Sequence, residues 1–382
     1  MSVTAAKGFE ASGVEAGLKS SGGLDLALVV NRGPLANAAA VFTSNRALAN
    51  PIIWSKQVIA DGTVSAIVLN SGGANCFTGA QGFQVTHATA EAVGSALDVS
   101  SGDVLVCSTG LIGDQLPLDK LLPAVAVAAA ALGDHGDEAS RAIMTTDSKP
   151  KRSIRLGNGY TVGGMAKGAG MLAPGLATML VVITTDVVLS SAELDIALRS
   201  ATRMSFDRLD SDGCMSTNDQ VSLLASGASE VEPPLDAFTA VLTEVCLDLA
   251  EQLQGDAEGA SHDIRIEVTG AATEDDAVEV GRSIARNNLF KAAIFGNDPN
   301  WGRVLAAIGT TDAAFDPYDV DVSMNGVRVC HEGAPDRPRT DVDLTNRRVD
   351  LLVDLKSGTA TATILTNDLT HDYVHENSAY SS

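Results

Sequence analysis

Short apolar segments typical of strands alternate with helix-forming segments along the chain, and this alternation restricts the fold more than any other feature. Residues 64–70 (VSAIVLN), 103–107 (DVLVC) and 179–184 (MLVVIT) have the composition of buried strands. Residues 86–97 and 234–254 have the composition and spacing of helices. Strands come both in adjacent pairs and separated by helices. We therefore expect an α/β (α+β) fold with a mixed sheet rather than a repeated βαβ barrel.

The C-terminal third continues the same pattern. Residues 262–269 alternate polar and apolar side chains, as a half-exposed strand does. Residues 274–289 begin with acidic residues and carry Arg286 in the last turn, a charge order that suits the dipole of a helix. Further strands are expected at residues 320–324, 349–355 and 359–365. No internal repeat or long Gly/Ser/Pro linker interrupts the chain.

The chain is strongly acidic, which argues against two classes of partner. Lys and Arg total 26 and Asp and Glu total 48 among 382 residues, a formal net charge of -22. Such a surface repels nucleic-acid phosphates and anionic membranes. Hydrophobic residues make up 45% of the chain, enough for a sizeable core. We expect a soluble protein that binds neither nucleic acid nor membrane.

Neither a secretory signal nor a transmembrane segment is indicated. The N-terminal residues MSVTAAKGFEASG lack a basic segment followed by an apolar run. The longest apolar run, residues 121–132, is too short to span a bilayer and contains Pro123, so we interpret it as a buried helix. We expect a cytoplasmic protein.

The cysteines and histidines give no pattern of metal ligands or disulfides. The cysteine count is odd, and no pair has C-x-x-C spacing. The six histidines are scattered and form no ligand cluster. A reducing compartment with free thiols is the simplest interpretation, and we expect no metal site. The cysteines are Cys76, Cys107, Cys214, Cys246 and Cys330.

The segment with the clearest chemistry is residues 163–186, GGMAKGAGMLAPGLATMLVVITTD. Glycines crowd Lys167, a Pro-Gly turn signal follows, and Ala177-Thr178 leads into the apolar strand. Thr178 has two interpretations. It is either an ordinary β-branched strand residue or a nucleophile exposed by cleavage of the peptide bond before it. A free α-amine, with a pKa near ~8, could take the proton of the Thr178 hydroxyl at neutral pH.

Eight motifs decide between these interpretations, because together they resemble the ornithine acetyltransferase family, the bifunctional glutamate N-acetyltransferases. They stand in family order at family-like spacing over nearly the whole chain. They are LNSGGAN (69–75), CSTGLIGDQLP (107–117), AIMTTD (142–147), KGAGMLAPGLATML (167–180), STND (216–219), DAEG (256–259), FGNDPNWGRVLAA (295–307) and ENSAYSS (376–382).

The resemblance implies a self-processing acetyl-transfer enzyme. It implies cleavage at the Ala177-Thr178 bond into an α fragment, residues 1–177, and a β fragment, residues 178–382. Thr178 is then acetylated by acetylornithine, ornithine leaves, and glutamate accepts the acetyl group as N-acetylglutamate. The implied architecture is an αββα-like layered core resembling N-terminal-nucleophile hydrolases, with a smaller C-terminal α/β portion. The implied assembly is an α2β2 heterotetramer.

The same resemblance assigns roles to residues spread over the whole chain. Thr109 and Gly110 stabilise the oxyanion, which a hydroxyl and a backbone N–H in a sharp turn suit chemically. Lys167 and Glu258 bind the charged ends of the substrate. The remaining substrate-binding positions are Thr145, Thr178, Asn377 and Ser382, and the last two require the C-terminal tail to be docked on the active site. For Thr109 and Gly110 the alternative is an ordinary turn after a strand. For Lys167 and Glu258 the alternative is a solvated surface charge.

The chain departs from the family pattern at a few positions and leaves some questions open. Ser261-His262 stands where we expect a Thr-Lys-like pair, Gln220 where a Thr is usual, and Cys76-Phe77 where a small residue precedes Cys. No cofactor is implied, although acetyl-CoA stays open as a second acetyl donor. The alternatives are a self-processing amidase or aminopeptidase with the same N-terminal Thr, and an unprocessed binding protein without turnover.

Overall fold

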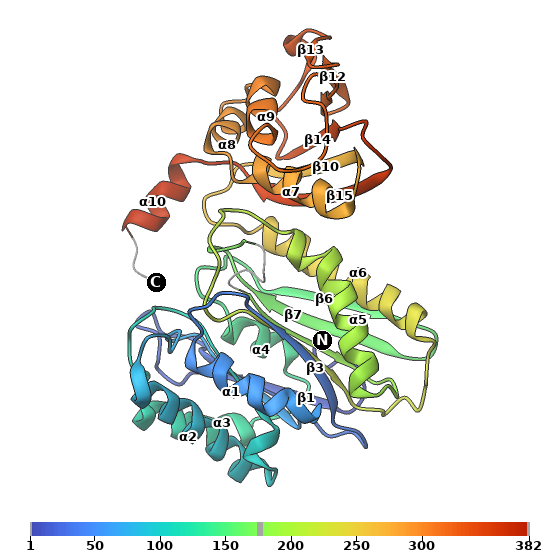
Figure 1. Ribbon diagram of the computed structural model, residues 1–382. Coiled ribbons are helices and arrows are strands. Elements are labelled where there is room, and N and C mark those ends of the chain that lie inside the picture. Colours follow the sequence, from blue (N-terminus) through green and yellow to red (C-terminus); the bar gives the residue numbers. More distant parts are fainter. Residues whose placement is uncertain (1, 174–178, 380–382) are drawn as a thin grey trace.

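Three β-sheets organise the molecule, two in a layered core and one in a C-terminal portion (Figure 1). The structure is a computed structural model that describes residues 2–173 and 179–379. The layered core occupies the lower part of Figure 1 and the C-terminal portion the top.

The first sheet has four strands in the order β1-β2-β4-β5. Its β4–β5 pair is parallel and the other pairs are antiparallel. Two helices, α2 and α3, pack on one face of it, and their apolar residues share a core cluster with alternate residues of β2, β4 and β5. The bounds are β1 Phe9–Val14, β2 Leu26–Asn31, β4 Ala66–Asn70, β5 Val104–Ser108, α2 Gly79–Leu97 and α3 Leu118–Ala130.

The second sheet has five strands in the order β3-β9-β8-β7-β6 and is covered by helices α5 and α6. Strands β8 and β9 are parallel neighbours, and β7 pairs with β8 in the antiparallel sense. The bounds are β3 Asn37–Phe42, β6 Lys151–Leu156, β7 Thr161–Lys167, β8 Leu180–Thr185, β9 Gln220–Ala225, α5 Ser191–Met204 and α6 Leu235–Gln254.

The two sheets pack face to face between these helix layers. In β8, Leu180 and Val182 join the cluster between the sheets, whereas Val181 and Ile183 face the α5/α6 layer. Successive side chains of a strand point to opposite faces, so each strand contributes to both cores. The result is the αββα order, with α2 and α3 at the bottom of Figure 1 and α5 and α6 above the sheets. The expected fold class is confirmed.

The C-terminal portion has its own sheet and its own core. Six strands lie in the order β13-β12-β11-β14-β10-β15, and α7, α8 and α9 pack on them. Its contact with the layered core runs through β15 and the segment after α5, where Leu209 bridges to Leu365. The bounds are β10 Asp263–Ala271, β11 Asp321–Met324, β12 Val327–His331, β13 Ala334–Pro335, β14 Arg348–Asp354, β15 Ala360–Asn367, α7 Glu274–Ala285, α8 Asn288–Phe295 and α9 Trp301–Ile308.

The described residues also include three other α-helices and four short 3-10 helices. Helix α10 leaves the C-terminal portion and extends along the outside of the molecule (Figure 1). The α-helices are α1 Asn50–Val58, α4 Gly136–Ala142 and α10 His371–Ala379. The short 3-10 helices are Ile59–Asp61, Ser101–Asp103, Phe206–Arg208 and Arg339–Asp341.

Two expectations about helices were wrong in detail. Residues 121–132 do lie largely in a helix, but α3 buries only one face, and Val127 on the other face is 57% exposed. Residues 274–289 are not one helix: α7 ends at Ala285, and Asn287 caps a second helix by accepting the N–H of Phe290. An Asn side chain at this position satisfies a free N–H at a helix start and so favours the break.

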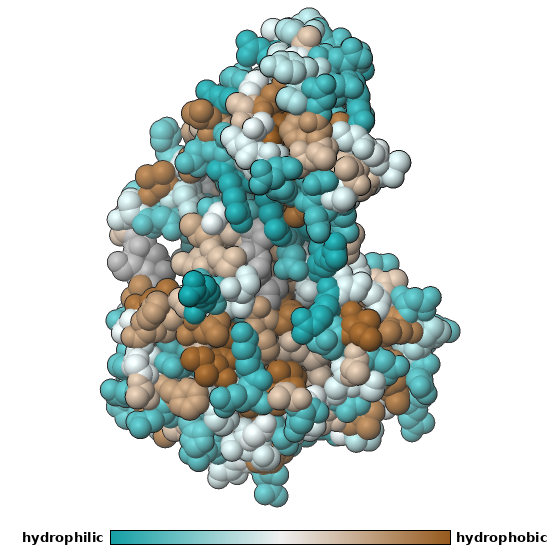
Figure 2. Space-filling view, viewed as in Figure 1, coloured by the Kyte–Doolittle hydropathy of each residue, from teal (hydrophilic) through white to brown (hydrophobic). Residues whose placement is uncertain are grey.

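Hydrophilic residues cover most of the face seen in Figure 2, and hydrophobic ones form separate small groups. The surface narrows between the layered core and the C-terminal portion. Within the described residues, none of the helices is long and apolar enough to cross a membrane. The same residues contain no group of three or more His, Cys, Asp or Glu side chains arranged to hold a metal ion.

Candidate active site

A cavity of about 130 Å³ brings together predicted site residues from distant parts of the chain. Its walls come from the end of β5, the end of β7, the turn before β9, the loop after α6 and helix α10. Three predicted positions, Ala177, Thr178 and Ser382, lie outside the described residues. The predicted residues that line the cavity are Thr109, Gly110, Thr145, Lys167, Glu258 and Asn377.

The turn after β5 is held rigidly by backbone contacts. Thr109 donates its N–H to the carbonyl of Asn70 at 3.0 Å and accepts the N–H of Gly73 at 2.9 Å. Gly110 has φ +126°, and a Cβ there would lie 2.8 Å from the nitrogen of Gly73. Only glycine fits this combination of conformation and close approach. The Gly110 N–H makes no hydrogen bond with the described residues.

Lys167 connects this turn to β7. Its side chain is buried, and Nζ donates to Oγ1 of Thr109 at 3.1 Å. Because Oγ1 accepts this bond, the hydroxyl proton of Thr109 is free to point at a developing oxyanion. Burial lowers the pKa of Lys167 below its ordinary value of 10.5, and the nearby carboxylate of Asp147 opposes that shift.

A buried ionic network fixes the surroundings of Lys167. Lys151 donates to Asp147 Oδ1 and to Asp256 Oδ2, each at 2.6 Å. Asp147 also accepts the N–H groups of Gly168 at 2.6 Å and Thr145 at 3.0 Å. Burial alone would raise the pKa of Asp147, but the Lys167 and Lys151 charges and the Gly168 N–H outweigh it and hold that pKa below its ordinary value. The network therefore favours the charged form of Asp147.

Glu258 faces the cavity from the loop after α6. Its N–H donates to the carbonyl of Ala169 at 2.9 Å, and its Oε2 accepts Nδ2 of Asn377 at 3.0 Å. A Cβ on Gly170 would lie 2.4 Å from this carboxylate, so the glycine leaves the space that Glu258 occupies. The cavity thus has a cationic end at Lys167 and an anionic end at Glu258.

The turn that leads into β9 supplies two residues that sequence reasoning left without a role. Asn218 donates to the carbonyls of Ser108 at 2.8 Å and Ala74 at 2.6 Å. Asp219 accepts the N–H of Met179 at 3.0 Å through Oδ1. In the sequence, only the STND motif pointed to these two residues, and it did not indicate what their side chains contact.

Comparisons with known proteins show which family the chain belongs to. The sequence model of the ArgJ family matches residues 10–382. The chain belongs to the ArgJ family. It is similar to the arginine biosynthesis bifunctional proteins ArgJ of Streptomyces avermitilis and Streptomyces coelicolor, at 65% and 64% identity over 100% of each chain. Ornithine acetyltransferase complexed with ornithine from Mycobacterium tuberculosis is 49% identical over 47% of this chain and 96% of that chain, with a TM-score of 0.43.

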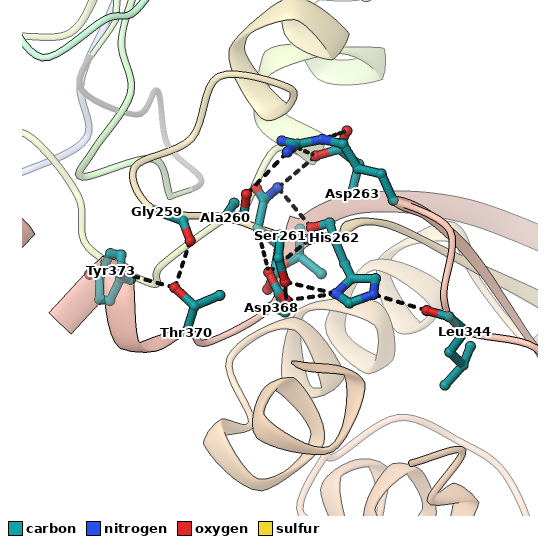
Figure 3. Close-up of polar contacts among 12 residues, drawn as sticks. Gly259, Ala260, Ser261, His262, Asp263, Leu344, Asp368, Thr370 and Tyr373 are labelled. Atoms are coloured by element: carbon teal, nitrogen blue, oxygen red, sulfur yellow. Dashed lines mark hydrogen bonds and ion pairs between the residues drawn. The ribbon is translucent and has the colours of Figure 1, made fainter. Parts of the chain in front are cut away.

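This ArgJ family member also has a Ser, a His and an Asp in contact with one another (Figure 3). Asp368 accepts the hydroxyl of Ser261 and lies 2.7 Å from Nδ1 of His262. The other ring nitrogen, Nε2, lies 3.0 Å from the carbonyl of Leu344. A nucleophilic triad needs the serine on the nitrogen opposite the carboxylate, and here a backbone carbonyl occupies that side. The cluster is structural, and it shows what the departure at residues 261–262 does in this chain.

The loop after Glu258 is tied to the start of α10 (Figure 3). The hydroxyl of Thr370 donates to the Gly259 carbonyl at 2.6 Å and accepts the N–H of Tyr373 at 2.9 Å. Gly259 has φ +59°, and a Cβ there would lie 2.2 Å from the Tyr373 nitrogen. The glycine of the DAEG motif is what allows α10 to approach this closely, and with it Asn377.

Proposed function

We propose that this ArgJ family member cleaves its own Ala177-Thr178 bond and then transfers the acetyl group of N2-acetylornithine to glutamate through an ester on Thr178. The observation that carries the proposal is the shared cavity, in which oxyanion donors, one buried cation and one carboxylate converge. Acetyl transfer in arginine biosynthesis fits the relatives that are 65% and 64% identical over 100% of each chain.

Cleavage precedes transfer for a chemical reason. An uncleaved Thr178 has no free amine and therefore no base of its own. After cleavage, the α-amine takes the hydroxyl proton as Oγ1 attacks the acetyl carbonyl, and the tetrahedral oxyanion forms. The Thr109 hydroxyl and the Gly110 N–H stabilise that charge, while ornithine leaves with the proton. The amine of glutamate then attacks the ester carbonyl, and the same donors act again. The bond from this carbon to Thr178 Oγ1 breaks, the proton of the glutamate amine passes to Oγ1 through the Thr178 amine, and N-acetylglutamate leaves.

The charges at the two ends of the cavity select amino-acid substrates. Lys167 pairs with a substrate carboxylate, and Glu258 with an ammonium group. The Asn377 amide donates to Glu258 at 3.0 Å and thereby orients it. Thr145, whose N–H is fixed by Asp147, offers its hydroxyl at the cavity wall. We assign Thr145, Lys167, Thr178, Glu258, Asn377 and Ser382 to substrate binding.

Three further features belong to the same proposal. Acetyl-CoA is a second acetyl donor for glutamate, in keeping with the bifunctional name of the relatives. The processed fragments, residues 1–177 and 178–382, assemble as an α2β2 heterotetramer. The enzyme works in the cytoplasm, where the described cysteines, all of them free thiols, stay reduced.

The proposal is tested by intact mass and by donor profiling. We expect two fragments that meet at Ala177/Thr178, and no cleavage and no turnover in Thr178→Ala. Acetyl release from acetylornithine should require glutamate, and acetyl-CoA should support acetylglutamate formation. Release that is independent of glutamate would favour the alternative, an amidase with the same N-terminal Thr. A single full-length species that binds acetylornithine without turnover would overturn both.

A further inference from the structure

The turn before β9 contacts the residue before Thr109 and the residue after Thr178. It does so through two consecutive side chains, those of Asn218 and Asp219. Asn218 reaches the first sheet, where its Nδ2 donates to the carbonyls of Ser108 and Ala74 at 2.8 and 2.6 Å. Ser108 directly precedes Thr109, the oxyanion residue. The side chain of Asn218 is itself fixed, because its Oδ1 accepts the Thr217 hydroxyl at 2.6 Å. One buried amide thus holds the residue before the oxyanion turn and also the loop at residue 74.

Asp219 reaches the start of β8 on the other side. Its Oδ1 accepts the Met179 N–H at 3.0 Å, and the Met179 carbonyl accepts the N–H of Gln220 at 3.2 Å. Both peptide groups of residue 179 are therefore held by hydrogen bonds. Its nitrogen is bonded to the carbonyl carbon of Thr178, so the Thr178 Cα lies two covalent bonds away. Asp219 therefore holds the amide group to which the nucleophile is covalently joined.

Adjacent residues make a short and stiff connection between the two parts. Consecutive Cα atoms are about 3.8 Å apart, and both side chains are buried and hydrogen-bonded. A misplacement of about 1 Å between reacting groups can cost about 100-fold in rate. A connection of this kind therefore bears directly on the distance between the nucleophile and the oxyanion donors.

We infer that Asn218 and Asp219 are positioning residues, which set the distance between Thr178 and the Thr109–Gly110 oxyanion turn. The inference rests on the proposed function. Neither side chain needs to touch the substrate. Asn218 acts through the backbone of residues 74 and 108, and Asp219 acts through the amide of residue 179.

The chemistry of Asp219 predicts which substitution is tolerated. Burial raises the pKa of this carboxyl well above its ordinary range. The N–H of Met179, the hydroxyl of Ser216 and then the charge of Lys167 only partly oppose that shift. Oδ2 has no hydrogen-bond partner among the described residues, which a neutral acid tolerates better than a carboxylate does. Asn has the same shape and keeps an oxygen for the Met179 N–H, so Asp219→Asn should preserve the positioning, and Asp219→Ala should not.

The test compares Asp219→Ala and Asp219→Asn with a matched control in the full chain. Asp186 is equally buried, follows the opposite end of β8, and accepts the N–H groups of Thr161 at 2.8 Å and Lys7 at 3.1 Å. Intact mass gives the cleaved fraction, and kcat for acetyl transfer is normalised to cleaved molecules. The melting temperature and the KM for acetylornithine are measured on the same samples.

We expect Asp219→Ala to slow self-cleavage and to lower kcat per cleaved molecule about 100-fold, with KM close to that of the wild type. Asp219→Asn should recover most of that loss. Asp186→Ala should lower the melting temperature and leave kcat per cleaved molecule unchanged.

Three results would overturn the inference. One is an Asp219→Ala protein that cleaves and turns over like an active wild type. Another is a loss in kcat that Asp186→Ala reproduces at the same melting temperature. The third is an Asp219→Asn protein as impaired as Asp219→Ala. If Asp219→Ala does not fold, Asn218→Ala supplies the other half of the connection, and the same drop in kcat at constant KM is expected. An inactive wild type would instead count against the proposed function.

Discussion

The two walls of the cavity are built in opposite ways. The wall with Thr109 and Lys167 consists of buried strand ends, and its hydrogen bonds join residues that belong to two packed sheets. The wall with Glu258 and Asn377 consists of a loop and of α10, a helix in which no residue is buried. Elements with few buried contacts open locally at low free-energy cost, whereas core strands open only with the whole fold.

This difference suggests a division of labour. The buried wall keeps its donors in place whether or not substrate is bound, so its residues should act on the transition state and on kcat. The exposed wall is held by few contacts, so we expect it to open when acetylornithine is exchanged for glutamate. Its residues should act mainly on KM.

The largest effect is expected for Thr109→Val. Valine keeps the shape of the side chain but removes the hydroxyl that Lys167 orients at 3.1 Å. Loss of one oxyanion donor lowers kcat by about 100- to 1,000-fold. KM for acetylornithine should stay close to the wild-type value in steady-state assays. Thr89→Val is the control, because Thr89 is equally buried and bonds only within α2. If kcat fell as much in the control, the division of labour would be wrong.

The next effect is a pH dependence of substrate affinity set by Lys167. Because burial lowers its pKa below 10.5, its charge is lost at a lower pH than that of an ordinary lysine. Above the folded-state pKa, KM should rise by up to about tenfold per pH unit. The effect on stability has the opposite sign: the unfolded chain binds more protons, so the contribution of Lys167 to stability increases with pH up to 10.5.

Measurements of KM and melting temperature over the same alkaline range separate the two effects. Over this range KM should rise, whereas the melting temperature should show no loss of the contribution that Lys167 makes to stability. Lys167→Met should remove the alkaline change in KM together with much of the affinity at neutral pH. An unchanged alkaline limb in that variant would mean that another group titrates.

The buried wall was more predictable than the exposed one, although only in part. Apolar runs of strand length correctly predicted β4, β5 and β8, because burial on both faces leaves a continuous apolar signal. The αββα order came from the resemblance, since periodicity does not say which strands pair. The contact between Lys167 and Thr109 spans 58 residues of chain, and no local pattern predicts it.

The exposed wall depends on contacts that are still less visible in the sequence. Asn377 and Glu258 are 119 residues apart, and their hydrogen bond depends on how the C-terminal portion docks on the layered core. His262 looked like a departure without a role until Asp368 and the Leu344 carbonyl were found on either side of its ring. Asp219 had no assigned role beyond its place in the STND motif, because its contact with Met179 exists only once β8 and β9 pair.

A smaller effect is expected when the exposed wall is pushed apart by Gly259→Ala. The new methyl group would meet the Tyr373 nitrogen at 2.2 Å in a backbone conformation that alanine disfavours, so α10 must move. We expect KM to rise about tenfold, the equivalent of about 1.4 kcal/mol, with kcat retained. Gly326→Ala has a similar positive φ of +80° but nothing within 4 Å, and should cost stability alone. Equal KM changes in the two variants would show that strain, and not the position of α10, was measured.

The smallest effect is expected for Asn377→Ala, which removes one contact between α10 and Glu258 and one within α10, to the Tyr373 carbonyl. The amide donates to Glu258 at 3.0 Å, and an exposed hydrogen bond of this kind contributes about 0.5–1.5 kcal/mol. KM for acetylornithine should rise about two- to tenfold, while kcat and self-cleavage stay at wild-type levels. Ser378→Ala is the matched control, because its hydroxyl bonds only to His375 within α10. A loss of kcat in Asn377→Ala comparable to that in Thr109→Val would mean that the tail helps to hold the transition state, and that both walls of the cavity are catalytic.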